Sequence, residues 1–198
     1  MTGTRYGKKC IAAGNREKYR YMEGKTLEKK RDTAYVKRLA LMGMLFALAV
    51  VLSIIEGFIP VPVPVPGVRL GLANIVVMFA LLQLRKRDAL ALVVLKALFA
   101  AATRGAIAGA LSLSGGLLSF CVMALILSFR GEKATYLLIS VMGAVFHNVG
   151  QILAASLILD TFLWPYFPVL LLSGIVTGFA TSVLLKLTSP AFQRLHLK

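Results

Sequence analysis

The sequence predicts an all-α membrane protein, a bundle of six transmembrane helices, with five helices as the alternative. Three observations support this fold class: 58% of the 198 residues are hydrophobic, only 16% are charged, and the mean hydropathy is +0.79. Soluble domains have about 25% charged residues. After residue 38 only 11 Lys or Arg and 4 Asp or Glu remain. Lipid is therefore the expected main solvent of the fold.

The expected domain organisation has two parts, a basic cytoplasmic tail over 1–38 and a single transmembrane domain over 39–198. The tail holds 12 Lys or Arg and 4 Asp or Glu without a sustained apolar period. We expect it to be flexible, and either simply solvated or attracted to anionic lipid. The two cysteines, Cys10 and Cys121, lie in unlike contexts, so neither a disulfide nor a metal site is expected.

Six apolar segments are taken as spans, because about 20 residues at 1.5 Å per residue cross the hydrocarbon core. The second is short and counts as a span only if the proline-rich stretch before it also lies at membrane depth. The fourth starts among Ser and Gly residues at 112–116, which are expected to interrupt the helix. The spans are expected over 39–59, 70–84, 89–110, 115–129, 134–159 and 164–187.

The basic residues between these spans predict the orientation. Twenty Lys or Arg residues fall on the side that holds both termini, whereas the opposite side holds Arg69 alone. Because Lys and Arg accumulate on the cytoplasmic side, we expect a multi-pass protein of the cell membrane with both termini in the cytoplasm. The asymmetry also supports the short second span, since deleting it would place the basic cluster 85–87 outside.

Residues 59–67 read I-P-V-P-V-P-V-P-G. Alternating prolines keep the backbone extended and remove half of its N–H donors. We expect this stretch either to cover an outward cavity or to act as a rigid linker without ligand contact.

Ionisable side chains at membrane depth are costly, so they are candidates for function. Arg69 and Arg104 are expected near the same outer level as Glu56 and Asp160. The two arginines either hold a carboxylate or phosphate or pair with the two acids as structural ion pairs. Lys96 is expected to snorkel toward the cytoplasmic surface.

The fifth span carries a polar face. His147 and Gln151 are four residues apart and share this face with small residues, and Asn148 lies beside it. Lipid would penalise such a face, so it is expected to point into the bundle. It is interpreted as the lining of a cavity, with a hydrogen bond between helices as the alternative role of His147. The candidate substrate-binding residues are Glu56, Arg69, Asn74, Arg104, His147, Asn148 and Gln151.

Rows of small residues at a spacing of four allow helices to approach closely in lipid. We expect packing inside the bundle to explain most of these rows, with docking of a separate subunit as the alternative. The residues concerned are Gly43, Ala47, Ala97, Ala101, Gly105, Gly109, Gly174 and Gly178.

Signatures of catalysis are weak in this sequence. Gly24, Lys25 and Thr26 resemble the end of a phosphate-binding loop, but Tyr19 stands where that motif needs Gly. The aspartates are isolated, whereas Mg²⁺ on a diphosphate needs paired carboxylates. We therefore expect no enzyme, no metal and no cofactor. The net charge of +15 follows the membrane topology, so no nucleic-acid partner is expected either.

Three motifs together resemble a known family: P-V-P-G-V-R-L-G-L-A-N-I at 64–75, S-G-G-L-L-S at 114–119 and H-N-V-G-Q at 147–151. They are similar to the bacterial Gx transporter family, also called heptaprenyl diphosphate synthase component I, over residues 39–187. The resemblance implies a fold like the substrate-binding S components of energy-coupling-factor transporters. Those have six helices, a pocket open to the outside, and separate subunits that hydrolyse ATP.

The two names of that family imply different activities. We expect a non-catalytic transport subunit that binds a small polar or anionic molecule in an outward-facing pocket and depends on separate energising subunits. The alternative is a membrane accessory subunit that serves a soluble partner in polyprenyl diphosphate synthesis. A structural subunit without a ligand is the third possibility.

Overall fold

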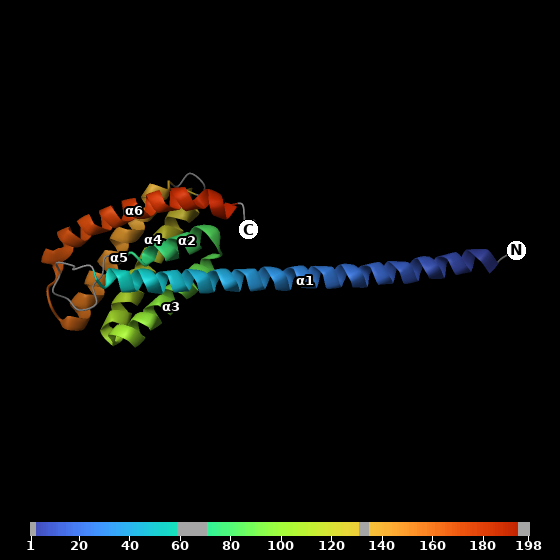
Figure 1. Ribbon diagram of the computed structural model, residues 1–198, viewed down its shortest axis with the longest axis horizontal. Helices are drawn as coiled ribbons and strands as arrows, with labels where there is room; N and C mark the ends of the chain where they lie inside the picture. The colour runs from blue at the N-terminus through green and yellow to red at the C-terminus, as the bar shows by residue number, and fades with distance from the viewer. Residues whose placement is uncertain (1–2, 59–70, 131–134, 194–198) are drawn as a thin grey trace. The chain divides into compact units, whose positions relative to one another are not determined.

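The computed structural model describes residues 3–58, 71–130 and 135–193. The chain divides into two units, residues 1–41 and 42–198, and the helix bundle belongs to the second (Figure 1). The all-α prediction is confirmed for the described residues, which contain no strand. The elements are α1 (Gly3–Glu56), α2 (Asn74–Gln83), α3 (Lys86–Arg104), α4 (Ala106–Arg130), α5 (Tyr136–Leu159), the short 3₁₀ helix η2 (Trp164–Tyr166) and α6 (Phe167–Gln193). The flexible character of 1–38 and the boundary at 38/39 stay predictions, and the backbone is helical from Gly3 onward.

Four described helical stretches are long and apolar enough to cross a membrane, which fits a multi-pass membrane protein. They are Arg31–Glu56, Ala106–Arg130, Tyr136–Leu159 and Trp164–Leu187. Of the other two expected spans, α2 has only 10 residues, or about 15 Å, half of the hydrocarbon core. In α3 Lys96 and Arg104 lower the hydropathy. Membrane crossing by these two segments, and the orientation of the termini, stay predictions.

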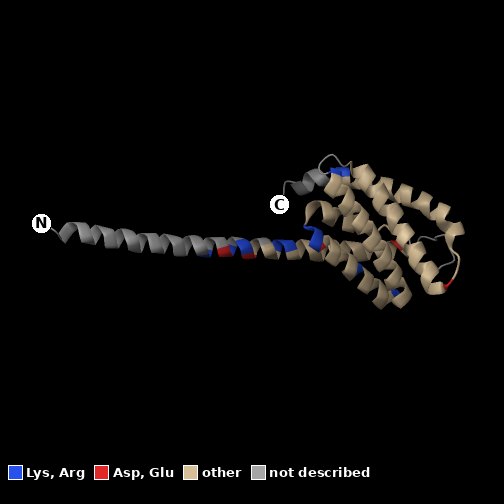
Figure 2. Ribbon diagram, turned by 180° about the vertical axis from the view of Figure 1, so that it is seen from behind, with Lys and Arg blue, Asp and Glu red and all other residues tan. Residues whose placement is uncertain are grey.

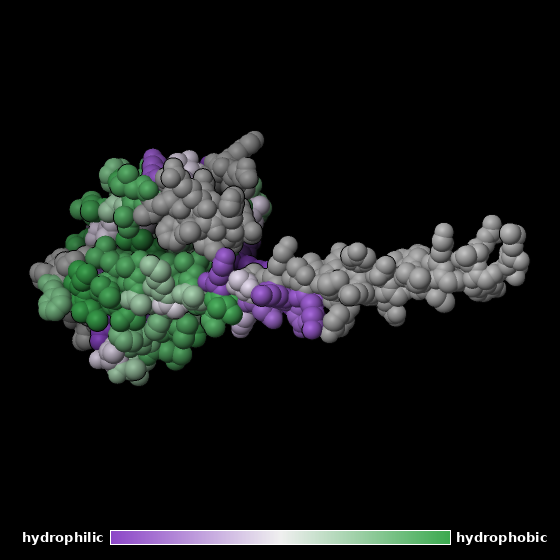
Figure 3. Space-filling model, turned by 45° about the vertical axis from the view of Figure 1, so that its right-hand side comes forward, coloured by the Kyte–Doolittle hydropathy of each residue, from purple (hydrophilic) through white to green (hydrophobic). Residues whose placement is uncertain are grey.

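Apolar side chains cover much of the outside of the bundle. In the part of α1 that belongs to it, Leu45, Ala49 and Ser53 are buried at a spacing of four, whereas Met44 and Val51 on other faces are exposed. The visible surface of the bundle is largely hydrophobic in Figure 3, and its ribbon carries few charged residues in Figure 2. Such a surface suits contact with acyl chains.

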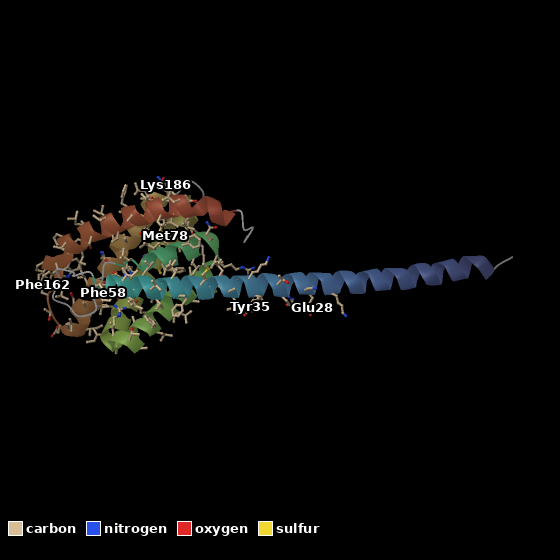
Figure 4. The ribbon with its side chains drawn as sticks, in the orientation of Figure 1. Glu28, Tyr35, Phe58, Met78, Phe162 and Lys186 are labelled. Carbon is tan, nitrogen blue, oxygen red and sulfur yellow. The ribbon has the colours of Figure 1, made fainter. Side chains whose placement is uncertain are left out.

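Helices that follow one another in sequence also pack side by side. The helix α4 lies against α3 and α5, α5 lies against α6, and α2 contacts α3, α4 and α5. Met78 of α2 is fully buried among them (Figure 4). Phe58 and Phe162, which are strongly exposed, lie at the same end of the bundle in Figure 4. The bundle thus encloses α2 and exposes aromatic rings at one end.

The turn between the third and fourth helices lies at Gly105, which corrects the boundary expected between 110 and 115. Gly105 has a φ of 96°, a left-handed conformation that costs glycine little. The helix α4 then runs on through residues 112–116 without interruption. Within this stretch Gly115 lies against His147 of α5, and Gly116 lies against Val93 of α3.

The helices α4 and α5 approach each other closely at two glycines, Gly115 and Gly150. A Cβ atom on Gly150 would lie 2.8 Å from the Cα of Gly115, and the hydroxyl of Ser114 donates a hydrogen bond to the carbonyl of Gly150 over 3.1 Å. Small residues at such contacts allow backbones to approach in lipid. This contact fixes the position of the polar face of α5 relative to α4.

Replacing Gly150 with alanine is expected to lower the free energy of unfolding by about 1–3 kcal/mol, because the backbone of α4 must move away. Unfolding of the detergent-solubilised protein by sodium dodecyl sulfate, followed by circular dichroism, measures this change. Gly43→Ala is the matched control, since a Cβ on that helical glycine would have no neighbour within 4 Å. An equal loss in both variants would contradict the close approach.

Two of the small-residue positions on α6 face α5. A Cβ on Gly178 would lie 2.6 Å from the Cα of Val141, and one on Gly174 would lie 3.1 Å from the Nδ2 of Asn148. Ala97 in α3 is buried as well. These three positions therefore contribute to contacts inside the bundle.

The other small residues have different surroundings. Gly109 lies against Ala101 across the α3–α4 turn, with 2.5 Å between a Cβ on Gly109 and the Ala101 Cβ. Gly105 forms that turn and belongs to no helix face. Gly43 and Ala47 are exposed on α1, so docking of a separate subunit at these two stays a prediction.

Candidate functional site

A small cavity between α1, α3, α4 and α5 gathers most of the charged residues of the bundle interior. Its volume is about 20 Å³, which is enough for about one water molecule. We call it the charged cavity. It is lined by Ser53, Glu56, Gly71, Ala73, Lys96, Arg104, Ser112, His147 and Gln151. In this conformation the site is filled by its own side chains.

Glu56, the last residue of α1, is 3% exposed. It ends the buried stripe of α1, three residues after Ser53. Its Oε1 accepts hydrogen bonds from the backbone N–H groups of Gly71 and Leu72, the latter over 3.4 Å. These donors lie just before the start of α2. The carboxylate therefore links the end of α1 to the beginning of α2.

Two cations of α3 line the same cavity. Lys96 is 6% exposed, and its ammonium group is attracted by Glu56 and repelled by Arg104. The guanidinium of Arg104 donates a 3.5 Å hydrogen bond to the hydroxyl of Ser53. With one carboxylate and two cations, the described lining keeps one net positive charge. In a low-dielectric interior such a charge favours the entry of an anion.

His147 and Gln151 supply the neutral polar groups of the cavity. The amide Nε2 of Gln151 lies 3.0 Å from His147 Nε2. The amide of Gln151 and the imidazole of His147 thus form one hydrogen-bonded pair on the same face of α5. The ring lies against Gly71 and Gly115, where a Cβ would come within 2.7 Å and 2.9 Å of imidazole atoms. Two glycines thus make the space in which this histidine is held.

A second cavity, of about 10 Å³, also has Gly71 in its lining. We call it the hydroxyl cavity, since Ser140, Thr177 and Thr181 contribute to its lining. Asn74 also lines it and donates a 2.7 Å hydrogen bond to the hydroxyl of Ser119, whereas its buried Oδ1 has no hydrogen-bond partner among the described residues. Gly71 lines both cavities.

Asn148 points away from both cavities. Its amide Nδ2 donates a 2.7 Å hydrogen bond to the carbonyl of Leu170 in α6 and lies 3.4 Å from the hydroxyl of Ser173. One residue after His147 on an α-helix, its side chain is turned by about 100°. The structure therefore places Asn148 in the α5–α6 contact.

The structure brings together four of the seven candidate binding residues: Glu56, Arg104, His147 and Gln151. Asn74 lines the hydroxyl cavity, and Asn148 lies in the α5–α6 contact. Arg69 and the proline stretch 59–67 lie outside the described residues. A ligand-binding role for any of these residues stays a prediction.

Sequence reasoning missed Lys96, which it expected to snorkel to the surface. The signal was the helical pattern of α3, where the buried residues Ala89, Leu92 and Val93 precede Lys96, and Ala97 and Ala100 follow it. A lysine in the middle of such a stripe faces the interior. Ser53, Ser112 and Gly71 were missed for lack of any charge. Among the described residues no three His, Cys, Asp or Glu side chains are grouped as metal ligands would be.

The family model for heptaprenyl diphosphate synthase component I matches residues 45–188. The chain belongs to this family. The matched range includes the whole of α2 to α5 and all the described residues that line the two cavities. The family resemblance stated from the three motifs is thereby confirmed.

No curated protein matches the chain, and no solved structure matches it. The similarity to S components of energy-coupling-factor transporters therefore stays a prediction. The description of the family names a component of a synthase, which is compatible with a subunit that performs no catalysis itself.

Proposed function

We propose that this chain is a membrane-embedded, non-catalytic substrate-binding subunit of a transport system. It binds a small polar or anionic molecule, with a carboxylate or phosphate as the favoured group, in a pocket that faces outward. Separate subunits energise the transport. The observation that carries this proposal is the charged cavity. Among its lining residues, the two positive charges of Lys96 and Arg104 outnumber the single negative charge of Glu56.

In the proposed complex, Arg104 and Lys96 attract the anionic group, and His147 and Gln151 donate or accept hydrogen bonds. Arg69 and Asn74 belong to the proposed site as further polar groups, whereas Asn148 holds α5 against α6 through its hydrogen bond to Leu170. The present cavity holds about one water molecule, so entry of a ligand requires the surrounding helices to separate. Such opening is a usual step in binding between helices.

The family description supports a second candidate, a membrane accessory subunit of polyprenyl diphosphate synthesis. A diphosphate is also an anion, and the same two cations suit it. The first candidate predicts copurification with ATP-binding subunits, whereas the second predicts copurification with a soluble prenyl diphosphate synthase. Native mass spectrometry of the purified protein, searching for a retained small molecule, tests whether the site holds a ligand at all.

Replacing Arg104 with alanine is expected to weaken binding of the retained molecule about 10- to 100-fold, because a charge-assisted contact contributes about 1.5–3 kcal/mol. Gln151→Ala is expected to weaken it about fivefold, the usual effect of a neutral hydrogen bond. Isothermal titration in detergent measures both. Arg87→Ala, an exposed arginine near the start of the same helix, is the control. Unchanged affinity in both site variants would remove the site assignment.

A further inference from the structure

The carboxylate of Glu56 occupies a set of contacts that is typical of a bound anion. It accepts hydrogen bonds from two successive backbone N–H groups, those of Gly71 and Leu72, directly before α2. Backbone N–H groups near the start of a helix are a common site for carboxylate and phosphate groups. The anion in this position is supplied by the chain itself.

The cation that faces this carboxylate has few other partners. Lys96 is buried, lines the charged cavity and makes no hydrogen bond within the described residues. Glu56 is the acidic group that attracts it, whereas Arg104 repels it. An ammonium with three donors prefers several acceptors. The site therefore has donor capacity that one shared carboxylate does not satisfy.

The free space beside the Glu56 carboxylate is small. Beside Glu56, the cavity leaves about 20 Å³, enough for about one water molecule and too little for a carboxylate or phosphate group of a ligand. An anion that reaches Lys96 and the two backbone donors must therefore take the place of the Glu56 carboxylate.

We infer that Glu56 is a built-in substitute for the ligand's anionic group, and that a carboxylate- or phosphate-bearing ligand binds by displacing it. This inference rests on the proposed function. It assigns Gly71 N–H, Leu72 N–H and Lys96 as the anion subsite, and it reverses the role that the sequence suggested for Glu56. A residue that contacts the ligand strengthens binding, whereas a substitute that competes with the ligand weakens it.

The two roles predict opposite effects of one substitution. Glu56→Gln keeps the shape of the side chain and removes the charge that competes for the subsite. We expect inorganic phosphate and diphosphate to bind about tenfold more tightly to this variant than to the original chain, as removal of a charge-assisted competitor implies. Isothermal titration of the full-length protein in detergent, with each anion as the probe, measures the change.

Two further variants control for folding and for net charge. Glu56→Asp keeps the charge but shortens the reach of the carboxylate. The anion affinity of this variant should therefore lie between those of the original chain and of Glu56→Gln. If Glu56→Gln does not fold, Glu56→Asp is used in its place. Asp160→Asn removes one exposed acid, in a left-handed conformation that asparagine also adopts, and should leave the affinity unchanged.

Each outcome decides the inference. Tighter binding in Glu56→Gln, with Asp160→Asn unchanged, supports the substitute role. Equal or weaker binding in the Glu56 variants, while the original chain binds the anion, overturns the substitute role and leaves the proposed function standing. Failure of every folded form to bind phosphate or diphosphate overturns the substitute role, and the absence of any retained molecule in native mass spectrometry overturns the proposed function as well. Equal tightening in Asp160→Asn shows an effect of net charge alone and overturns the substitute role.

Discussion

Replacing Lys96 with methionine is expected to lower the free energy of unfolding by about 3 kcal/mol, because it leaves the buried carboxylate of Glu56 with less compensation. The value lies at the low end of the range for buried pairs, since Arg104 stays near the carboxylate. Methionine has a similar length and fills the space of the lysine stem. Denaturation in mixed micelles, followed by circular dichroism, provides the measurement.

Lys86→Met is the matched control on the same helix. Its ammonium group is exposed and donates a 3.0 Å hydrogen bond to the hydroxyl of Ser128, and exposed contacts of this kind contribute at most about 1 kcal/mol. The double variant Lys96→Met with Glu56→Gln should recover part of the lost stability, because the uncompensated charge is gone. Strict additivity of the two substitutions would contradict the electrostatic coupling.

The second large effect is expected for Gly71→Ala, with a loss of about 2–4 kcal/mol in the free energy of unfolding. Two causes combine here. Gly71 has a φ of 86°, which is strained for alanine, and a Cβ would lie 2.7 Å from the Cδ2 of His147. The same micelle denaturation measures the loss.

Gly105→Ala separates these two causes. Gly105 has a similar φ of 96°, but a Cβ there has no neighbour within 4 Å, so only the backbone strain of about 1–2 kcal/mol is expected. Adding His147→Ala to Gly71→Ala should recover the steric part of the loss. If Gly71→Ala and Gly105→Ala proved equally stable, the imidazole would not limit the space at Gly71.

The sequence was sufficient to predict the helical class and part of the site. The polar face of α5 could be predicted because side chains four residues apart share a helix face, and His147 and Gln151 do meet over 3.0 Å. The convergence of Glu56 and Arg104 could be predicted from their shared depth. Both arguments depend on distances along one helix or along the membrane normal, which the sequence encodes directly.

The sequence-based predictions that the structure corrects concern residues whose positions depend on contacts between helices. Gly105 was assigned to a small-residue row, but a row of glycines and alanines suits both a helix interface and a turn, and only the neighbouring helix decides between them. Lys96 was expected at the surface, because a lysine stem can reach water from moderate depth. The side chain of Asn148 is directed by the carbonyl of Leu170 in α6, a partner that no spacing within α5 reveals.

The position of Gly71 on the border of both cavities has a further consequence. Gly71 has no side chain, its N–H group is bound by the Glu56 carboxylate, and the imidazole of His147 lies beside it. Displacement of that carboxylate would release a backbone segment that borders both cavities, so the charged groups and the hydroxyl groups would change their surroundings together.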